Sequence, residues 1–396
     1  MLPIIQFFGD LIMQKELFCT TSRIVFGPGT LNDIGTELRR LGATKVCIVT
    51  DPGVMSTGII ERLTTVLEAA ELGVCLYDQV QADPPFELVD QTVEIVKEHG
   101  ADAIVGIGGG SSLDMAKITG AMATNPGSVS EYFGIDLLPN PGLPTILIPT
   151  TAGTGSEVTP IVILSDNTEQ LKKGVVSSHL YPACALLDPE LTLGLPPKVT
   201  AATGMDALIH AIEAYTSKNA TPMSDLLAKE AMRLIYANIR TAYANGENIE
   251  GRTNMLRGAM LAGMAFANAG VTAVHAFAYP IGAQFHIPHG IANTIMLVPV
   301  MQFNMLGNLD RFADIADFFG QPTEGLSQRA KAQVTVDALI ELASDLQVPQ
   351  HLSEYGVTHD HVPNLAENVL KVTRLLANNP RKLLLDDAIS IYTAAV

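Results

Sequence analysis

The chain has 396 residues, of which 47% are hydrophobic and 16% are charged, so it is long enough for two domains with cores of their own. Its formal net charge is −17 with no basic run to offset it, which argues against binding to nucleic acid or to an anionic membrane surface. The sequence contains no stretch of 18 uninterrupted apolar residues, so we expect no membrane-spanning segment.

The N-terminal segment 1–13 is apolar but lacks a basic start and a small-residue cleavage site, so we do not interpret it as a signal peptide. It is interpreted as an extension, or as residues that precede an alternative start at Met13. The four cysteines contain no CxxC pair, which argues against a zinc ribbon or a disulfide scaffold and favours a cytoplasmic protein.

In the first half of the chain, strand patterns alternate with helix patterns. Strands are expected at 45–51, 72–78, 101–110 and 144–150, and helices at 58–70, 86–100 and 111–124. This alternation predicts an α/β fold with a mainly parallel, Rossmann-like sheet and helices on both of its faces.

The second half of the chain carries helix patterns and no convincing strands. Helices are expected at about 204–215, 221–243, 253–268, 328–346 and 362–377. The change falls near Gly194–Lys198. We therefore expect an α/β domain at 1–196 and an all-α domain at 197–396, with a cleft between them.

Two glycine-rich loops follow expected strands. GIGGGSS (106–112) leads into a helix, where glycines let the backbone approach a phosphate and the helix N-terminus offers free N–H donors. Ser111 stands where a GxGxxG pattern has its last glycine, so a tight strand–helix turn remains an equal alternative. TTAGTGSE (150–157) repeats the arrangement, and together the loops favour a phosphate-bearing cofactor.

Asp51 stands at the end of an expected strand. A carboxylate there can accept hydrogen bonds from a ribose 2′-hydroxyl and would repel the 2′-phosphate of NADP, so it favours NAD. An ordinary turn aspartate is the alternative.

A carboxylate and an imidazole share one face of an otherwise apolar helix. Asp206 and His210 are four residues apart, and three further histidines, His275, His286 and His289, follow within 274–290. One aspartate with two or three histidines fits Fe(II), Zn(II) or a similar divalent ion. The spacing leaves open which later histidines bind, and a hydrogen-bonded core pair without a metal is the alternative.

Five segments occur in an order that resembles the iron-containing, or group III, alcohol dehydrogenases, which have a dehydroquinate-synthase-like fold. The resemblance covers essentially the whole chain after about residue 15. These segments are RIVFGPGTL (23–31), GIGGGSSLDMAK (106–117), PTTAGTGSEVT (149–159), GMDALIHAIEAY (204–215) and AVHAFAYPIGAQFHIPHGIAN (273–293).

The resemblance implies roles for individual residues. It gives the metal ligands as Asp206, His210, His275 and His289, and it leaves His286 as a pocket or outer residue. It gives the cofactor contacts as Asp51, Gly108, Gly109, Gly110, Ser111, Thr150, Thr151, Thr154, Lys173 and Leu191. Phe266 is implied as a wall of the substrate pocket.

Two positions depart from the family's pattern. Tyr279 replaces the second histidine of an HxxxHPxG motif, and because a phenol is a weak base but a good hydrogen-bond donor, we expect it to assist proton transfer without acting as a base. Asp83 stands where some members carry an asparagine that faces the cofactor.

The resemblance implies hydride transfer between NAD(H) and a small alcohol or aldehyde at an Fe(II) or Zn(II) site, by a homodimer or higher oligomer. A neutral substrate is favoured, although Arg374 and Arg381 leave an acidic aldehyde open. The alternatives are a hydroxyacid–oxoacid transhydrogenase that retains its cofactor, a dehydroquinate-synthase-like lyase, which would need more basic residues, and a non-catalytic metal-binding protein.

Overall fold

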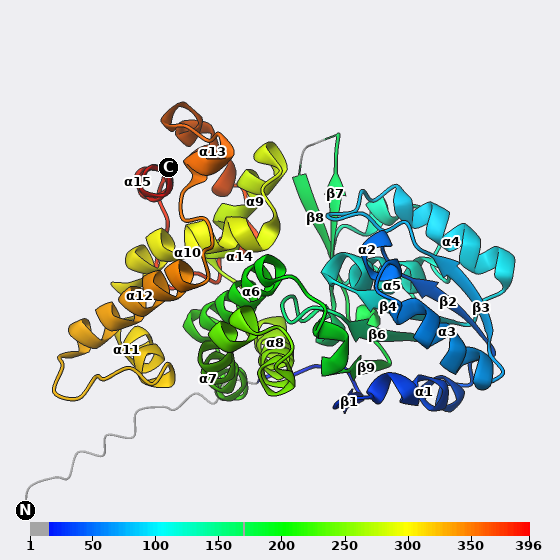
Figure 1. The fold of residues 1–396 in the computed structure, drawn as a ribbon. Coiled ribbons are helices and arrows are strands. Elements are labelled where there is room, and N and C mark those ends of the chain that lie inside the picture. The colour runs from blue at the N-terminus through cyan, green and yellow to red at the C-terminus, as the bar shows by residue number, and fades with distance from the viewer. Residues whose placement is uncertain (1–15, 169–170) are drawn as a thin grey trace, which may run out of the picture.

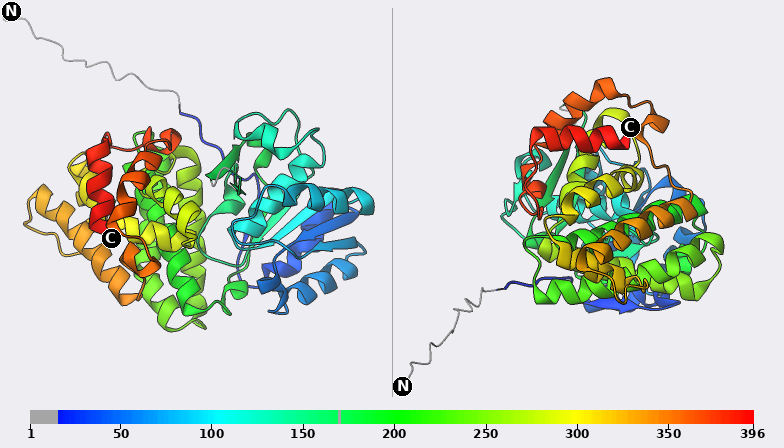
Figure 2. Two further views of the ribbon diagram at one scale, coloured as in Figure 1. Left: turned by 90° about the horizontal axis from the view of Figure 1, so that it is seen from above. Right: turned by 90° about the vertical axis from the view of Figure 1, so that its left-hand side faces the viewer.

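A computed structural model describes residues 16–168 and 171–396, so the predicted N-terminal extension and Met13 lie outside the described residues. An α/β part formed by the first half of the chain lies beside a helical part formed by the second half (Figure 1). The view from above shows the two parts next to each other, with the C-terminus in the helical part (Figure 2).

The α/β part is built on a six-stranded sheet in which every pair of neighbouring strands is parallel, in the order β1-β9-β6-β4-β2-β3. Its strands are β1 (Ile24–Phe26), β2 (Lys45–Val49), β3 (Gly73–Tyr77), β4 (Ala103–Gly108), β6 (Thr145–Pro149) and β9 (Cys184–Leu187). The predicted parallel sheet is therefore confirmed.

Helices cover both faces of this sheet because side chains on its strands alternate between two cores. On β2, Val46 and Ile48 join the core under α1 (Ile34–Arg40) and α3 (Ile59–Ala69). Cys47 and Val49 point the other way, into the core under α4 (Leu88–His99) and α5 (Gly110–Met122). The short helix α2 (Pro52–Met55) follows β2 directly.

A second, three-stranded sheet was not predicted. It contains β5 (Gly134–Ile135), β7 (Ile161–Asp166) and β8 (Leu171–Val176) in the order β5-β8-β7, and β7 and β8 are antiparallel. No helix separates the two longer strands in the sequence, and β8 carries two lysines, so it lacks the continuous apolar run that marked the main strands.

From Pro197 onward the described chain forms helices and no strand, as predicted. They are α6 (Pro197–Thr216), α7 (Pro222–Ala244), α8 (Ile249–Ala269), α9 (Ala273–Phe285), α10 (His289–Met305), α11 (Leu309–Phe318), α12 (Gln328–Asp345), α13 (Val362–Val369), α14 (Thr373–Leu376) and α15 (Leu385–Ala395). The single helix predicted at 362–377 is wrong, because the chain leaves the helix between α13 and α14.

The fold class is thus an α/β part with a parallel sheet followed by a helical part. Within the residues that the structure describes, no single helix is long and apolar enough to cross a bilayer. Helices α8 and α9 pass that test only as a pair, and they meet at a bend of 100°.

Candidate metal and cofactor site

The order in which the chain adds strands to the main sheet reverses between β2 and β4. The chain runs from β2 outward to β3 and then returns to β4 on the other side of β2. In parallel sheets, such a reversal opens a crevice at the carboxyl ends of the two strands, where ligands bind. Asp51 follows β2 in this crevice and accepts hydrogen bonds from the backbone N–H of Val54, at 3.1 Å, and from Ser112 Oγ, at 2.8 Å. It therefore caps α2 and also holds the first turn of α5.

Glycines keep the crevice open beside β4. Gly108 has a φ of +146°, and a Cβ there would lie 2.7 Å from Ser112 Oγ and 2.9 Å from Asp51 Oδ2. A Cβ at Gly110 would lie 2.7 Å from Cγ2 of Thr154. Because α5 begins at Gly110 and its N-cap, Gly109, has no side chain, the first backbone N–H groups of α5 are free to bind a phosphate.

The second predicted loop lies against the first. The backbone N–H of Thr150 donates to the carbonyl of Gly108 at 2.9 Å, and Thr151 and Thr154 adjoin Gly109 and Gly110. The structure therefore brings both glycine-rich loops to one edge of the sheet.

Two charged residues of α5 hold this second loop. Asp114 accepts a hydrogen bond from Ser156 Oγ, and the buried Lys117 Nζ donates to the carbonyl of Ser156 at 3.0 Å. Burial lowers the pKa of Lys117, while Asp114, 3.1 Å away, opposes that change. A displaced α5 would therefore displace both loops.

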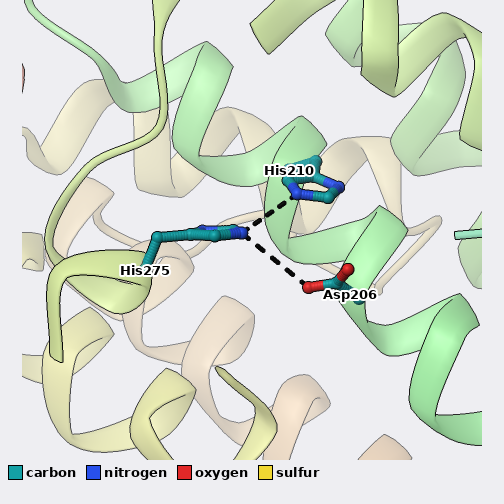
Figure 3. A group of neighbouring side chains, drawn as sticks. All are labelled: Asp206, His210 and His275. Carbon is teal, nitrogen blue, oxygen red and sulfur yellow. Dashed lines mark hydrogen bonds and ion pairs between the residues drawn. The ribbon is translucent and has the colours of Figure 1, made fainter. Parts of the chain in front are cut away.

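Three ligating side chains converge between α6 and α9. Asp206 and His210 point from α6 towards His275 on α9 (Figure 3). His275 Nε2 lies 3.0 Å from His210 Nε2 and 3.8 Å from Asp206 Oδ1, and one potential ligand atom from each residue lies within 4.8 Å of the others. All three residues are buried, so the structure confirms that the helical spacing brings these side chains together.

Glu213 adjoins this cluster and was not among the predicted site residues. Its carboxylate accepts hydrogen bonds from Thr272 Oγ1, from the backbone N–H of Val274 and from His275 Nδ1, and it is fully buried. With the proton on Nδ1, the Nε2 lone pair of His275 faces Asp206 and is free for a metal. The signal was present in the sequence, because Glu213 follows Asp206 by seven residues and so lies on the same face of α6.

The pKa shifts differ between the two histidines of the cluster. Burial opposes a charge on His275, but the carboxylates of Glu213 and Asp206 outweigh burial and raise the pKa of His275. Burial lowers the pKa of His210 to about 4, so this imidazole is neutral and offers a lone pair. Burial alone would raise the pKa of Asp206, but the neighbouring histidines lower it, so the carboxylate is ionised. Two imidazole Nε2 atoms at 3.0 Å beside a buried carboxylate form a donor set that an ion can satisfy.

The fourth predicted ligand lies next to this cluster. His289 begins α10, and its Nε2 lies 3.9 Å from Asp206 Oδ1. The side-chain amide of Asn293, one turn later, donates to Asp206 Oδ1 at 2.7 Å and lies 3.1 Å from His289 Nε2. The amide nitrogen of Asn293 therefore lies beside the lone pairs of both potential ligands, on the side where a metal ion would attract them.

One cavity joins the glycine loops to the cluster. It has a volume of about 240 Å³ and is lined by Gly110, Ser111 and Thr154 from the cofactor side and by the four predicted metal ligands. Phe266 stacks on His210 with ring centroids 4.4 Å apart, and Tyr279 lies 6.3 Å from the His289 ring. Burial raises the pKa of Tyr279 above its usual 10.

Some predicted site residues lie elsewhere. Lys173 pairs with Asp166 at 2.8 Å, whereas the preceding residue, Lys172, lines the cavity and pairs with Asp83 at 2.6 Å. Leu191 is buried in the core beneath α1 and α3. Its contact with a cofactor stays a prediction, as does that of Lys173.

Two other predicted positions are His286, at the end of α9, and Arg381, in the loop between α14 and α15. His286 is exposed and ends α9 with a left-handed backbone, so its place in the pocket stays a prediction. Arg381 donates to the carbonyl of Phe303 and lies over its ring, 3.9 Å from the centroid, which occupies its guanidinium.

Comparison with known proteins identifies the family of the chain. Residues 21–189 match the iron-containing alcohol dehydrogenase profile, and residues 200–396 match the C-terminal profile of the Fe-containing alcohol dehydrogenase family. The chain belongs to the iron-containing alcohol dehydrogenase family. It is therefore an oxidoreductase, and the predicted family is confirmed.

Relatives of this alcohol dehydrogenase match over nearly its whole length. It is 41% identical to a sulfoacetaldehyde reductase of Bilophila wadsworthia, covering 95% of this chain and 97% of the relative. It is 38% identical to an NAD-dependent methanol dehydrogenase of Bacillus methanolicus, covering 94% and 97%. A crystal structure of a 1,3-propanediol oxidoreductase superposes with a TM-score of 0.94 at 37% identity, covering 97% and 100%.

Proposed function

We propose that this enzyme reduces a small aldehyde, or oxidises the corresponding alcohol, with NAD(H) and a divalent metal ion, Fe(II) or alternatively Zn(II). The observation that carries this proposal is the single cavity lined both by the first turn of α5 and by the metal cluster. A nicotinamide cofactor bound along the two glycine loops and a substrate at the cluster would share that space.

Asp206, His210, His275 and His289 would hold the ion. Three neutral histidines and one carboxylate leave a divalent site with a net charge of about +1. The ion supplies Lewis-acid polarisation of the substrate oxygen, and the nicotinamide supplies or accepts the hydride. The protein keeps the ligand set fixed through Glu213, which orients the His275 ring.

Asp51 and the two glycine loops would bind the cofactor. The Asp51 carboxylate lies beside the loop glycines, where it can accept from a ribose hydroxyl and repel a 2′-phosphate, which favours NAD over NADP. Lys173 stays a predicted cofactor contact. We add Lys172, because Lys172 lines the cavity next to Asp83, whose backbone N–H donates to Ser111 Oγ at 3.3 Å.

Phe266 and Tyr279 would shape the reacting end of the cavity. Phe266 packs flat against His210 and excludes water from one side of the cluster. Tyr279 stays protonated because burial raises its pKa, so it can donate a hydrogen bond to a substrate oxygen but cannot act as a base near neutral pH. The proton exchanged in the reaction would then pass through water and the ribose hydroxyls.

Three further features complete the proposal. The chain divides into domains at 196/197, where α6 begins. It assembles as a homodimer or a higher homo-oligomer. It works in the cytoplasm, which suits the free thiols of Cys19, Cys47, Cys75 and Cys184.

Hydride transfer is tested with NADH that carries deuterium at both C4 positions, so that the result does not depend on which face of the ring reacts. The metal-loaded enzyme is mixed with butanal, and mass spectrometry measures deuterium at C1 of the butanol formed. Transfer of one deuterium with release of free NAD supports the proposal. Transfer that stops after one equivalent of retained cofactor would instead indicate the transhydrogenase, and no transfer with bound NADH and metal would reject both.

A further inference from the structure

A second, larger cavity adjoins the metal cavity on its outer side. It has a volume of about 690 Å³ and lies between β8, α9, α13 and the segment that leads into α14. The two cavities share the lining residues Ile163, Lys172, Tyr279 and Arg374. A substrate whose reacting carbon is at the cluster would extend past these residues into the outer cavity.

The outer cavity has a charge opposite to that of the protein. The chain has 41 acidic and 24 basic residues. Nevertheless, Lys172, Lys371 and Arg374 line the outer cavity, while its described lining contains no aspartate or glutamate. Its other polar side chains are neutral and can donate hydrogen bonds: the phenol of Tyr279 and the amides of Gln284, Asn364 and Asn368. Because the global charge repels anions, attraction of an anion here has to come from these local cations.

Of the three cations, Arg374 is the one without a hydrogen bond or ion pair to another described residue. Lys172 is occupied by Asp83, and Lys371 donates to Asn368 Oδ1 at 2.8 Å. In contrast, Arg374 makes no hydrogen bond or ion pair with any described residue. Its Nη2 lies close to Gly174 on β8, because a Cβ added to that glycine would be 4.0 Å away. The guanidinium thus reaches from α14 to β8 and stands at the junction of the two cavities, with its donors free.

We propose that the substrate carries an anionic group, a carboxylate or a sulfonate, a few bonds from its aldehyde or alcohol carbon, and that Arg374 binds this group. The proposal rests on the aldehyde reductase function proposed above. A planar guanidinium binds the two oxygens of such a group at once, which fixes the far end of the substrate and aims its near end at the cluster. Lys371 and the amides of the outer cavity supply further donors.

The test compares substrates that differ only in charge. Succinic semialdehyde is paired with its uncharged methyl ester, and sulfoacetaldehyde is included to separate sulfonate from carboxylate. We expect kcat/KM for the better anionic aldehyde to exceed that for the ester by about 10-fold or more, because a charge-assisted hydrogen bond contributes about that factor. Which anionic aldehyde is better identifies the group.

Variants locate the preference at Arg374. In Arg374→Gln the anionic-to-neutral ratio of kcat/KM should fall about 10-fold, mainly through KM, and Arg374→Lys should restore part of it. Arg329→Gln removes the same charge from an exposed site on α12 and should leave the ratio unchanged. A wild-type ratio near one, or a ratio that Arg374→Gln does not alter, would overturn the proposal.

A binding measurement separates this inference from the proposed function. Calorimetry with the Zn(II)-loaded enzyme and NAD compares 2-hydroxyethanesulfonate with its neutral analogue 2-(methylsulfonyl)ethanol. Tighter binding of the sulfonate that is lost in Arg374→Gln supports the anion site even if no aldehyde is reduced. Turnover of the neutral ester without any anion preference in rate or binding rejects the anion site and leaves the reductase intact.

Discussion

Replacement of Glu213 by glutamine should weaken metal binding although Glu213 is not expected to touch the metal. The carboxylate accepts three hydrogen bonds, and one of them holds the proton of His275 on Nδ1. Glutamine keeps the shape but has one acceptor oxygen and an amide that donates. Its NH₂ group would therefore face at least one N–H or O–H donor, and the His275 ring would lose the partner that keeps Nε2 directed at the ion.

The expected loss is about 10- to 100-fold in metal affinity, the usual range for residues that hydrogen-bond to a metal-binding histidine and fix its orientation. Zn(II) affinity is measured by competition with a chromophoric chelator on metal-stripped protein. Folding stability is measured in parallel, since an unsatisfied buried donor costs about 1–3 kcal/mol. Glu213→Asp keeps the charge and should recover part of the affinity.

Glu157→Gln is the matched control. Glu157 is also a buried glutamate, but among the described residues its side chain makes no hydrogen bond with any of the four predicted ligands, so its replacement should leave Zn(II) affinity unchanged. A Glu213→Gln protein that binds Zn(II) as tightly as the wild type would refute the reasoning. An equal loss in both variants would refute it as well, because the effect would then reflect a general weakening of the core.

Four further outcomes are expected. His289→Ala should lose metal and activity together, and full metal occupancy in this variant would remove His289 from the ligand set. Asp51→Gly should raise the use of NADP relative to NAD, and an unchanged ratio of kcat/KM for the two cofactors would contradict the role of Asp51. Tyr279→Phe should lower kcat without shifting the pH profile between about pH 6 and pH 9, since Tyr279 is protonated throughout; a lost pH limb would show that it acts as a base. Burial raises the pKa of Glu157 to about 7 from 4.5 in the unfolded chain, so its contribution to stability is lost as pH rises through about 7. In denaturant unfolding, Glu157→Gln should lack this loss, which is at most about 3 kcal/mol. An equal dependence of the unfolding free energy on pH in both proteins would contradict the shift.

The sequence was informative wherever a local pattern determines the structure. Four of the six parallel strands, β2, β3, β4 and β6, were recognisable as short apolar runs, whereas β1 and β9 were not predicted. The pairing of Asp206 with His210 followed from helical spacing alone. The β7–β8 hairpin was missed because no helix pattern separates its strands and because β8 mixes two lysines with apolar residues. The break between α13 and α14 was missed because the apolar pattern continues across it.

Contacts between residues far apart in the chain could not be predicted from the sequence. The seven-residue spacing places Glu213 on the same face of α6 as Asp206, but its contact with His275 joins α6 to α9, and no local pattern predicts that contact. Lys172 and Lys173 are indistinguishable by type, and only the alternation of side chains on β8 decides which one lines the cavity. Arg374 and Arg381 also look alike in the sequence, but Arg381 is occupied by Phe303 while Arg374 lines both cavities.

The most direct test of the account is anaerobic NADH oxidation with a panel of short aldehydes, comparing metal-stripped enzyme with enzyme reconstituted with Fe(II). Because the cavity combines the cofactor loops with the Asp206 cluster, we predict turnover that is absent without metal and restored by Fe(II). Equal turnover with and without metal, while NADH binds in both cases, would contradict the assignment of the cluster as the metal site of the reaction.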